Sequence, residues 1–264
     1  MTILTDKYDF SLVIACYNEE PLLEESVKEV VQVLDSTCWT YEVIFVDDCS
    51  QDSTREIIDR LIKKYKNKNF RKLFHEKNTG RGRTVTDGFR IAHSDIVGYI
   101  DIDLEVPARY VPSMITALKN GADLATAHRV YKIHWRLFHR FVLSTGYKWL
   151  TRSLLGVNLK DTETGFKFFN RDRILPILGQ VEDEHWFWDT EVMVRSLLQG
   201  YRIVEIPCLF IKRYDKRSSV NIFQDSFDYF VKLWQFRRVV QQMRKVTSQS
   251  QSTAEGRPVL PMSE

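Results

Sequence analysis

The 264-residue sequence lacks any uncharged apolar run long enough to cross a lipid bilayer. A membrane-spanning helix needs about 20 consecutive apolar residues, whereas the longest runs here have the length of strands, such as 10–17 and 43–46. The sequence also has little net charge, because 38 Lys and Arg residues offset 35 Asp and Glu residues and leave a formal charge of +3. This small excess excludes a protein that attracts nucleic acid over its whole surface, so any charged ligand must be bound by a local cluster.

Cysteine is scarce as well, with four residues at 16, 38, 49 and 208 and no C-x-x-C pair. This spacing indicates neither a zinc site nor a disulfide framework, so we expect a reducing, cytoplasmic location. The composition is 44% hydrophobic and 28% charged, which is typical of a globular protein and excludes a mostly disordered chain. The length favours one large core.

Short apolar segments alternate with helical patterns along the chain. Strands are predicted near 10–16, 42–47, 71–75, 96–101, 122–127, 165–170 and 202–211. Helices are predicted over 22–34, 57–62, 84–92 and 188–199. This alternation is typical of an α/β protein whose mostly parallel central sheet is flanked by helices.

Three acidic residues, Asp101, Asp103 and Glu105, follow the apolar strand that ends at Ile100. Side chains alternate along an extended chain, so the three carboxylates are expected to point to one side. Two carboxylates about 4 Å apart repel by about 4 kcal/mol at an effective dielectric constant of about 20. A divalent cation would reverse that cost, and hard oxygen ligands favour Mg²⁺ or Mn²⁺. The pattern predicts a metal site, with a solvated acidic turn as the alternative.

Polar residues also follow the first two strands. Asn18 and Glu19 come after the first strand, and Asp47 and Asp48 end the second, so all four belong to one edge of the sheet. Such groups can bind a nucleoside, although the same residue types also cap helices at strand-to-helix turns. The segment 78–83 adds two glycines and two arginines at the start of a helix, which suits a phosphate group.

These motifs occur in a characteristic order within residues 8–220. They are Tyr17-Asn18-Glu19, Val46-Asp47-Asp48-x-Ser50-x-Asp52, Asn78-x-Gly80-x-Gly82, Asp101-x-Asp103, the segment 161–169 and Trp188-Asp189-Thr190-Glu191. In this order and spacing the chain resembles the inverting family 2 glycosyltransferases with the GT-A fold. Within that family it is most similar to dolichol-phosphate mannose synthases and bacterial polyprenyl-phosphate glycosyltransferases. The resemblance implies a GT-A catalytic domain over 1–220 and a nucleotide-diphosphate sugar as donor.

The resemblance also implies roles for single residues on the donor side. The expected nucleotide-binding residues, which include one from the glycine-rich segment, are Ala15, Tyr17, Glu19, Asp48 and Arg81. Mg²⁺ or Mn²⁺ is expected at Asp101 and Asp103. Glu105 is a third candidate ligand, because it stands where the subfamily commonly has glutamine and retains an oxygen ligand.

The segment 124–160 contains no Asp or Glu but carries seven Lys and Arg residues. No nucleic-acid motif accompanies it, and a solvated basic helix is the other simple explanation. Arginines opposite an acidic metal site fit better with a second substrate that carries phosphate. The subfamily resemblance implies that the acceptor phosphate is bound by Arg129, Arg140, Ser144, Arg213 and Ser218.

We therefore predict an inverting transfer of a sugar from GDP-mannose or a UDP-sugar to a polyprenyl or dolichyl monophosphate. In this reaction Asp101, Asp103, Arg129, Arg140 and Arg213 would be the catalytic residues. One alternative is transfer to a sugar hydroxyl, for which Asp189 would be the base, unless it is only a carboxylate at a helix N-terminus. A second alternative is an anion-binding scaffold that is not an enzyme. Nucleic acid is not an expected partner.

The region after the catalytic domain has its own pattern. Residues 221–246 are predicted to form an amphipathic helix, and 247–264 a disordered tail, because that Ser-, Gln- and Thr-rich segment has few apolar residues. The helix carries apolar residues near one face and cations toward its end, which are Phe227, Phe230, Leu233, Trp234, Lys232, Arg237, Arg238, Arg244 and Lys245. It is expected to hold the protein on the cytoplasmic membrane surface without crossing it. Packing of the aromatic residues onto the catalytic domain is the alternative.

Overall fold

The structure is a computed structural model that describes residues 8–130, 146, 150–213 and 222–255, with side chains given for 228–245 of the last range. The strands are β1 (Phe10–Cys16), β2 (Tyr41–Asp47), β3 (Asn69–Phe74), β4 (Ile96–Ile100), β5 (Leu124–Val130), β6 (Phe166–Asn170) and β7 (Ile203–Leu209). The helices are α1 (Leu23–Asp35), α2 (Thr54–Lys64), α3 (Arg81–Ile91), the 3₁₀-helix η1 (Ala108–Tyr110), α4 (Val111–Lys119), α6 (Arg171–Leu178), α7 (Trp188–Leu198) and α8 (Ile222–Glu255).

These strands form one seven-stranded sheet in the order β3-β2-β1-β4-β6-β5-β7. Every neighbouring pair is parallel except the two that include β6, which runs antiparallel to β4 and to β5. The predicted α/β class and mostly parallel sheet are confirmed. Helix α3 begins three residues earlier than the apolar periodicity indicated, because its first turn carries polar residues, which periodicity does not register.

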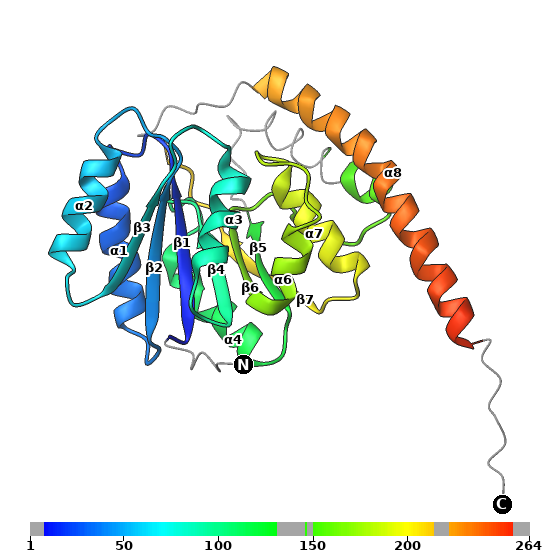
Figure 1. Cartoon of the computed structure of the whole chain (residues 1–264), viewed down its shortest axis with the longest axis horizontal. Helices are drawn as coiled ribbons and strands as arrows, with labels where there is room; N and C mark the ends of the chain where they lie inside the picture. The colour runs from blue at the N-terminus through cyan, green and yellow to red at the C-terminus, as the bar shows by residue number, and fades with distance from the viewer. Residues whose placement is uncertain (1–7, 131–145, 147–149, 214–221, 256–264) are drawn as a thin grey trace, which may run out of the picture.

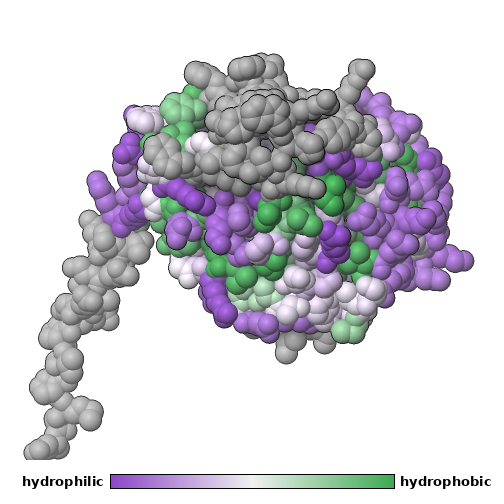
Figure 2. Space-filling view, turned by 180° about the vertical axis from the view of Figure 1, so that it is seen from behind, coloured by the Kyte–Doolittle hydropathy of each residue, from purple (hydrophilic) through white to green (hydrophobic). Residues whose placement is uncertain are grey.

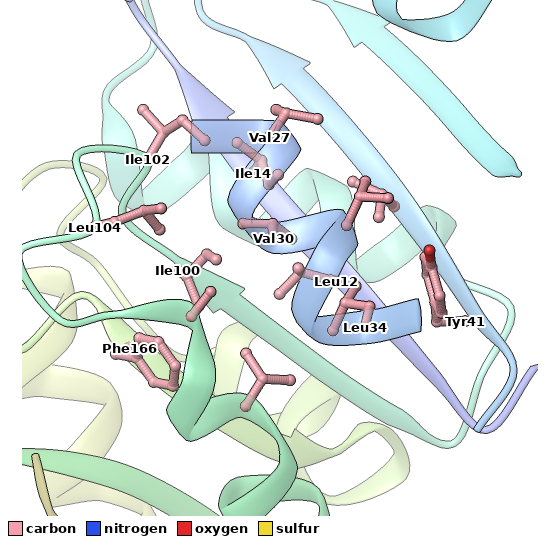
Figure 3. Packing of buried hydrophobic residues seen from close by; sticks show 14 of the residues in the cluster. Leu12, Ile14, Val27, Val30, Leu34, Tyr41, Ile100, Ile102, Leu104 and Phe166 are labelled. Carbon is pink, nitrogen blue, oxygen red and sulfur yellow. The ribbon is translucent and has the colours of Figure 1, made fainter. Parts of the chain in front are cut away.

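Helices cover both faces of the sheet (Figure 1). On one face, α1, α2, α4 and the sheet share a buried apolar cluster. In this cluster Val27, Val30 and Leu34 of α1 face Leu12 and Ile14 of β1 (Figure 3). On the other face, α3, α6 and α7 share a second cluster. The central strands are thus buried on both sides, which explains why they read as nearly continuous apolar runs.

Helix α8 packs against the second cluster and lies at the opposite end of the molecule from α2 (Figure 1). Leu233, Phe236 and Val240 of α8 are buried, and the ring of Phe236 meets that of Phe187 edge-on at 5.6 Å. The alternative in which the helix packs aromatic residues onto the catalytic domain is therefore confirmed for this face. Leu233 was expected on the membrane-facing side, but it is a core residue.

The predicted boundary between the C-terminal helix and the tail is wrong in the structure. The helix continues to Glu255, nine residues into the segment 247–264 that was expected to be disordered. Extending an existing helix adds one hydrogen bond for each residue fixed, whereas starting one is costly, so a polar sequence can prolong a helix that it could not begin. Residues 256–264 lie outside the described part of the chain. None of the described helices combines the length and apolarity that a membrane crossing needs.

Glycine is required in β4 by a close approach between neighbouring strands. Gly98 pairs with Phe168 of β6, and a side-chain methyl group at Gly98 would overlap the buried ring of Phe168. Gly98→Ala should therefore lower the free energy of unfolding by about 1–3 kcal/mol, as overpacked cores do. Urea denaturation followed by circular dichroism measures this change.

Gly179→Ala is the matched control, because Gly179 has an ordinary φ of −68°. A methyl group there would lie 3.5 Å from the nearest neighbour, the carbonyl oxygen of Pro176. Its effect should stay within about 0.5 kcal/mol. Equal stability of Gly98→Ala and the wild type would show that the β4–β6 contact can relax.

Candidate active site

The loops that follow β1 and β2 are tied to each other by side chains. The backbone N–H of Asn18 donates to Ser50 Oγ at 2.9 Å, and the N–H of Gln51 donates back to Asn18 Oδ1 at 2.8 Å. The N–H of Glu19 donates to Thr54 Oγ1 at 2.8 Å. The N-cap residues of α1 and α2 make no capping bond through their side chains. Asn18 and Ser50 therefore shape the loops and do not cap the helices.

The end of β1 and the loop after it carry three of the expected nucleotide-binding residues. Ala15 lies beside Val46 in the register of β1 and β2, and Glu19 lies in the loop after β1. Tyr17 is 47% exposed, so its ring is open to an incoming aromatic group. The roles of all three in nucleotide binding stay predictions.

Asp48 is buried and fully engaged within the protein. Its Oδ1 accepts from the N–H and the hydroxyl of Thr79, both at 2.8 Å, and lies 2.9 Å from His75 Nδ1. Its Oδ2 accepts from the N–H of Gly80 at 2.8 Å. Burial alone would raise the pKa of Asp48, but hydrogen bonds from these three residues hold it below its usual value. Asp48 thus fixes the loop before α3, and its expected contact with a nucleotide stays a prediction.

The glycines of segment 78–83 have packing roles. A side chain at Gly80 would overlap His185, and one at Gly82 would overlap Trp188, so both residues let α3 approach the start of α7 and the segment before it. Arg83 pairs with Asp87 at 2.8 Å. The first turn of α3 is therefore shaped by its contacts with the protein, and a phosphate ligand stays a prediction.

Strand β4 ends at Ile100, and the acidic residues that follow lie in a turn. Burial still alternates as predicted, because Ile102 and Leu104 point into the core (Figure 3) while the acidic residues are partly exposed. The backbone does not stay extended, however, since Leu104 has a positive φ of 51°. A bulky residue rarely adopts this conformation, and strained residues of this kind often occur at functional sites.

The expected cluster of three carboxylates is not assembled. Glu105 turns toward the segment after β7, where its Oε1 accepts from the N–H of Arg213 at 3.3 Å and lies 3.7 Å from Lys212 Nζ. In the part of the chain that the structure describes, no three His, Cys, Asp or Glu residues form a group that could hold a metal ion. The Glu105 carboxylate is thereby engaged with residues after β7, and Asp101 and Asp103 remain as the predicted ligands.

Asp101 is held by Arg81, the first residue of α3. Its Oδ1 accepts from Arg81 Nη2 at 2.7 Å and Nε at 3.0 Å, while Arg81 Nη1 donates to Asp189 Oδ2 at 2.6 Å. A side chain at Gly165 would overlap both Asp101 and Arg81, so only glycine lets segment 161–165 approach this pair. Sequence motifs had suggested Arg81 as a phosphate ligand, but they gave no indication of this bridge.

Asp189 lies at the centre of a buried polar network. Its Oδ1 accepts from Lys167 Nζ at 2.6 Å and from the hydroxyl of Tyr99, and all three side chains are almost fully buried. Burial alone would raise the pKa of Asp189, but the charges of Lys167 and Arg81 hold it below its usual value. Burial lowers the pKa of Lys167. Lys167 belongs to a segment that carried the family resemblance, but its charge gave no sign that it would be buried.

Two of the expected acceptor residues lie in the described part of the chain. Arg129 makes a two-pronged ion pair with buried Asp161, at 2.7 and 2.8 Å, and lies 3.5 Å from Glu163. Arg213 donates from Nη1 to the carbonyl oxygen of Asp103 at 3.5 Å. The structure therefore brings Arg213 to the acidic turn. Arg140, Ser144 and Ser218 lie outside the described residues.

The engagement of Asp48 generates a pH-dependent prediction. Asp48→Asn should lower the free energy of unfolding at pH 7 by about 1–3 kcal/mol, because an amide leaves a buried N–H without an acceptor. The folded pKa lies below the unfolded value, so the unfolded state takes up the proton first, and the wild type loses this stabilisation as pH falls below about 4. Urea denaturation at pH 7 and pH 3 should show that the difference in stability between the wild type and Asp48→Asn is smaller at pH 3.

Asp59→Asn is the control, since Asp59 pairs with Lys72 at the surface. It should change stability by less than about 1 kcal/mol at either pH. A gap between the wild type and Asp48→Asn that keeps its size at pH 3 would contradict the role given to the Asp48 carboxylate.

Comparison with known proteins gives the same picture of the fold and family. The profile described as Glycosyl transferase family 2 matches residues 11–174. The chain is 34% identical over 204 residues to Glycosyltransferase AglD of Haloferax volcanii, covering 75% of this chain and 32% of that protein. It is 34% identical over 209 residues to Dolichol-phosphate mannosyltransferase of Pyrococcus furiosus, covering 76% of this chain and 56% of that protein. The chain thus spans about a third and about half of the lengths of these two relatives.

A solved structure shares the fold at low identity. Glucosyl-3-phosphoglycerate synthase from Mycobacterium tuberculosis, in complex with Mn²⁺, UDP and glucosyl-3-phosphoglycerate, superposes with a TM-score of 0.65 at 17% identity, covering 87% of this chain and 80% of that one. The predicted GT-A fold is therefore confirmed. The profile match covers more than half of the chain, so this protein belongs to glycosyl transferase family 2.

Proposed function

We propose that this protein transfers a sugar, with inversion, from GDP-mannose or a UDP-sugar to a polyprenyl or dolichyl monophosphate. The resemblance in sequence motifs supports this activity, as does the name of the Pyrococcus furiosus relative, a dolichol-phosphate mannosyltransferase. Because the chain spans only part of that relative, the structure of the site must provide the main argument for the acceptor class.

The state of Asp189 is the observation that carries the proposal. A sugar hydroxyl needs a general base, which must reach the acceptor and have a pKa near the working pH. Asp189 is buried, both of its oxygens accept from charged groups, and its pKa is held low, so it is a poor base. A phosphate monoester has a second pKa of about 6 and is already ionised at pH 7. The site therefore suits an acceptor that needs no base.

A divalent cation fits the remaining carboxylates. The side chain of Asp101 is 43% exposed, and no described residue donates a hydrogen bond to its Oδ2. Carboxylates at Asp101 and Asp103 match the way proteins hold Mg²⁺ or Mn²⁺ beside substrate phosphates. When bound, the ion would supply positive charge to the leaving diphosphate.

The chain's own residues would then act by positioning and by charge. Tyr17, whose ring is exposed, would stack on the nucleotide base, while Arg213, next to Asp103, would orient the acceptor phosphate toward the sugar carbon that it attacks. Arg129 lies at the end of β5 and would share its charge between Asp161 and the acceptor. Arg140, Ser144 and Ser218 complete the proposed acceptor site.

Attachment to the cytoplasmic face of a membrane is the second part of the proposal. Phe230 and Trp234 are 42% and 47% exposed on α8, with their rings 6.4 Å apart, and Arg237 lies over the Trp234 ring. Two cations that were expected to face lipid bind the catalytic domain instead. Lys232 pairs with Asp183, and Arg244 donates to the carbonyls of Leu155 and Gly156. The exposed aromatic pair is therefore the principal membrane anchor that we propose.

Transfer can be tested with a panel of GDP- and UDP-sugars, a short polyprenyl phosphate and Mg²⁺ or Mn²⁺, reading release of nucleoside diphosphate. Turnover should require the phosphate acceptor and should be lost with a chelator. Asp103→Asn should lower turnover about 100-fold or more, because it removes a charge from the site that stabilises the leaving group. Asp172→Asn, which changes an exposed carboxylate on α6, is the matched control and should be fully active.

Transfer to the free polyprenol or to a glycan, with none to the polyprenyl phosphate, would favour the hydroxyl-acceptor alternative. In that case Asp189→Asn should abolish turnover, whereas with a phosphate acceptor its effect should follow only the loss of folded protein. Thermal unfolding of the Asp189→Asn variant separates these two causes.

Membrane attachment can be tested by flotation of the full chain with anionic liposomes. Replacing both Phe230 and Trp234 with Ser should weaken binding about tenfold or more, because it removes more than about 1.5 kcal/mol of apolar burial. Both rings are exposed, so the double variant should fold like the wild type, which circular dichroism checks.

Removal of Lys63 and Lys64 of α2 is the control for general charge effects. These cations belong to the last turn of α2, a helix at the far end of the molecule from α8 (Figure 1), and that end is predominantly hydrophilic in Figure 2. Their replacement by Gln should leave flotation unchanged. Undiminished flotation of the Phe230 and Trp234 double variant would exclude this anchor.

A further inference from the structure

Arg81 occupies the carboxylate that the proposed cation would need. Two of its nitrogens donate to Asp101 Oδ1, and its guanidinium lies between two aromatic rings, 5.2 Å from the centre of Tyr99 and 5.3 Å from that of Trp186. The Arg81 side chain is only 13% exposed. A cation that approaches Asp101 therefore meets a fixed positive charge at contact distance.

The charges around Arg81 indicate which carboxylate its guanidinium neutralises. Asp189 already has a counter-charge in the buried ammonium of Lys167 and a further donor in the Tyr99 hydroxyl. The positive charge of Arg81 is thus left to balance Asp101, the more exposed of its two partners. Only a second anion could draw the guanidinium away from Asp101 without leaving a buried charge unpaired.

The location of Arg81 suggests what that anion is. Arg81 is the first residue of α3, whose N-terminus favours negative charge. On one side the guanidinium lies over the ring of Trp186, which is 53% exposed, so an exposed side chain covers Arg81 there. A diphosphate is the anion that the proposed donor would bring.

We propose that Arg81 makes cation binding at Asp101 dependent on the nucleotide. Without a diphosphate, the guanidinium neutralises Asp101 and opposes Mg²⁺ or Mn²⁺. When the diphosphate arrives, Arg81 pairs with it and releases Asp101 Oδ1 to the cation. Arg81 is then a positioning residue that couples the two ligands, and the inference rests on the proposed metal site at Asp101.

Mn²⁺ alone is the probe, with free Mn²⁺ measured by electron paramagnetic resonance in the absence of nucleotide. Arg81→Met should bind Mn²⁺ about tenfold or more tightly than the wild type, in the usual range of coupling between sites. Arg81→Lys, which keeps the charge, should stay close to the wild type. Adding Asp101→Asn to Arg81→Met should remove the gain. Arg81→Met should fold, since Asp189 keeps Lys167 and Tyr99 as partners.

Arg83→Met is the matched control. Arg83 lies two residues further along α3 and pairs with Asp87 and Glu184, so its loss should not change Mn²⁺ affinity. If Arg81→Met binds Mn²⁺ no more tightly than the wild type, the inference is overturned while the proposed function stands. If the wild type fails to bind Mn²⁺ even with GDP or UDP, the metal site itself is wrong and the inference falls with it.

Discussion

The ion pair between Lys167 and Asp189 is the interaction on which the geometry of the site depends. Both side chains are almost fully buried, where removing a charge from water costs several kcal/mol, so each one fixes the position of the other. The second oxygen of Asp189 accepts from Arg81, which also donates to Asp101. Through this chain of contacts β6, α7, α3 and the end of β4 hold one another. Breaking such a pair from one side typically costs about 3–5 kcal/mol.

The reversed strand β6 explains why these groups meet. It runs antiparallel to β4, with its first residue, Phe166, beside Ile100 at the end of β4. The segment 161–165 therefore enters the sheet at the edge where the parallel strands end. The N–H of Asp101 donates to the carbonyl of Gly165 at 2.8 Å across this junction. A parallel strand in the same place would bring that segment to the opposite edge, away from the site.

Helix α8 combines two roles that a single amphipathic pattern cannot separate. One side buries Leu233 and Phe236 against the catalytic domain, and another exposes Phe230 and Trp234. The packed side fixes the helix, so the exposed aromatic pair has a defined position on the enzyme. An enzyme whose proposed acceptor lies in a bilayer would benefit from such fixed placement, because the site must meet a phosphate at the membrane surface.

The sequence by itself determined the parts of this protein that follow local rules. Alternating apolar segments predicted the sheet, and motif order predicted the family, because both are carried by residues close together in the chain. Only the tertiary structure decided the partners of the charged groups. Arg81 meets Asp189 across 108 positions, and Glu105 turns to Arg213 across another 108. Periodicity carries no information about such pairs, since which charges become buried together depends on how distant elements pack.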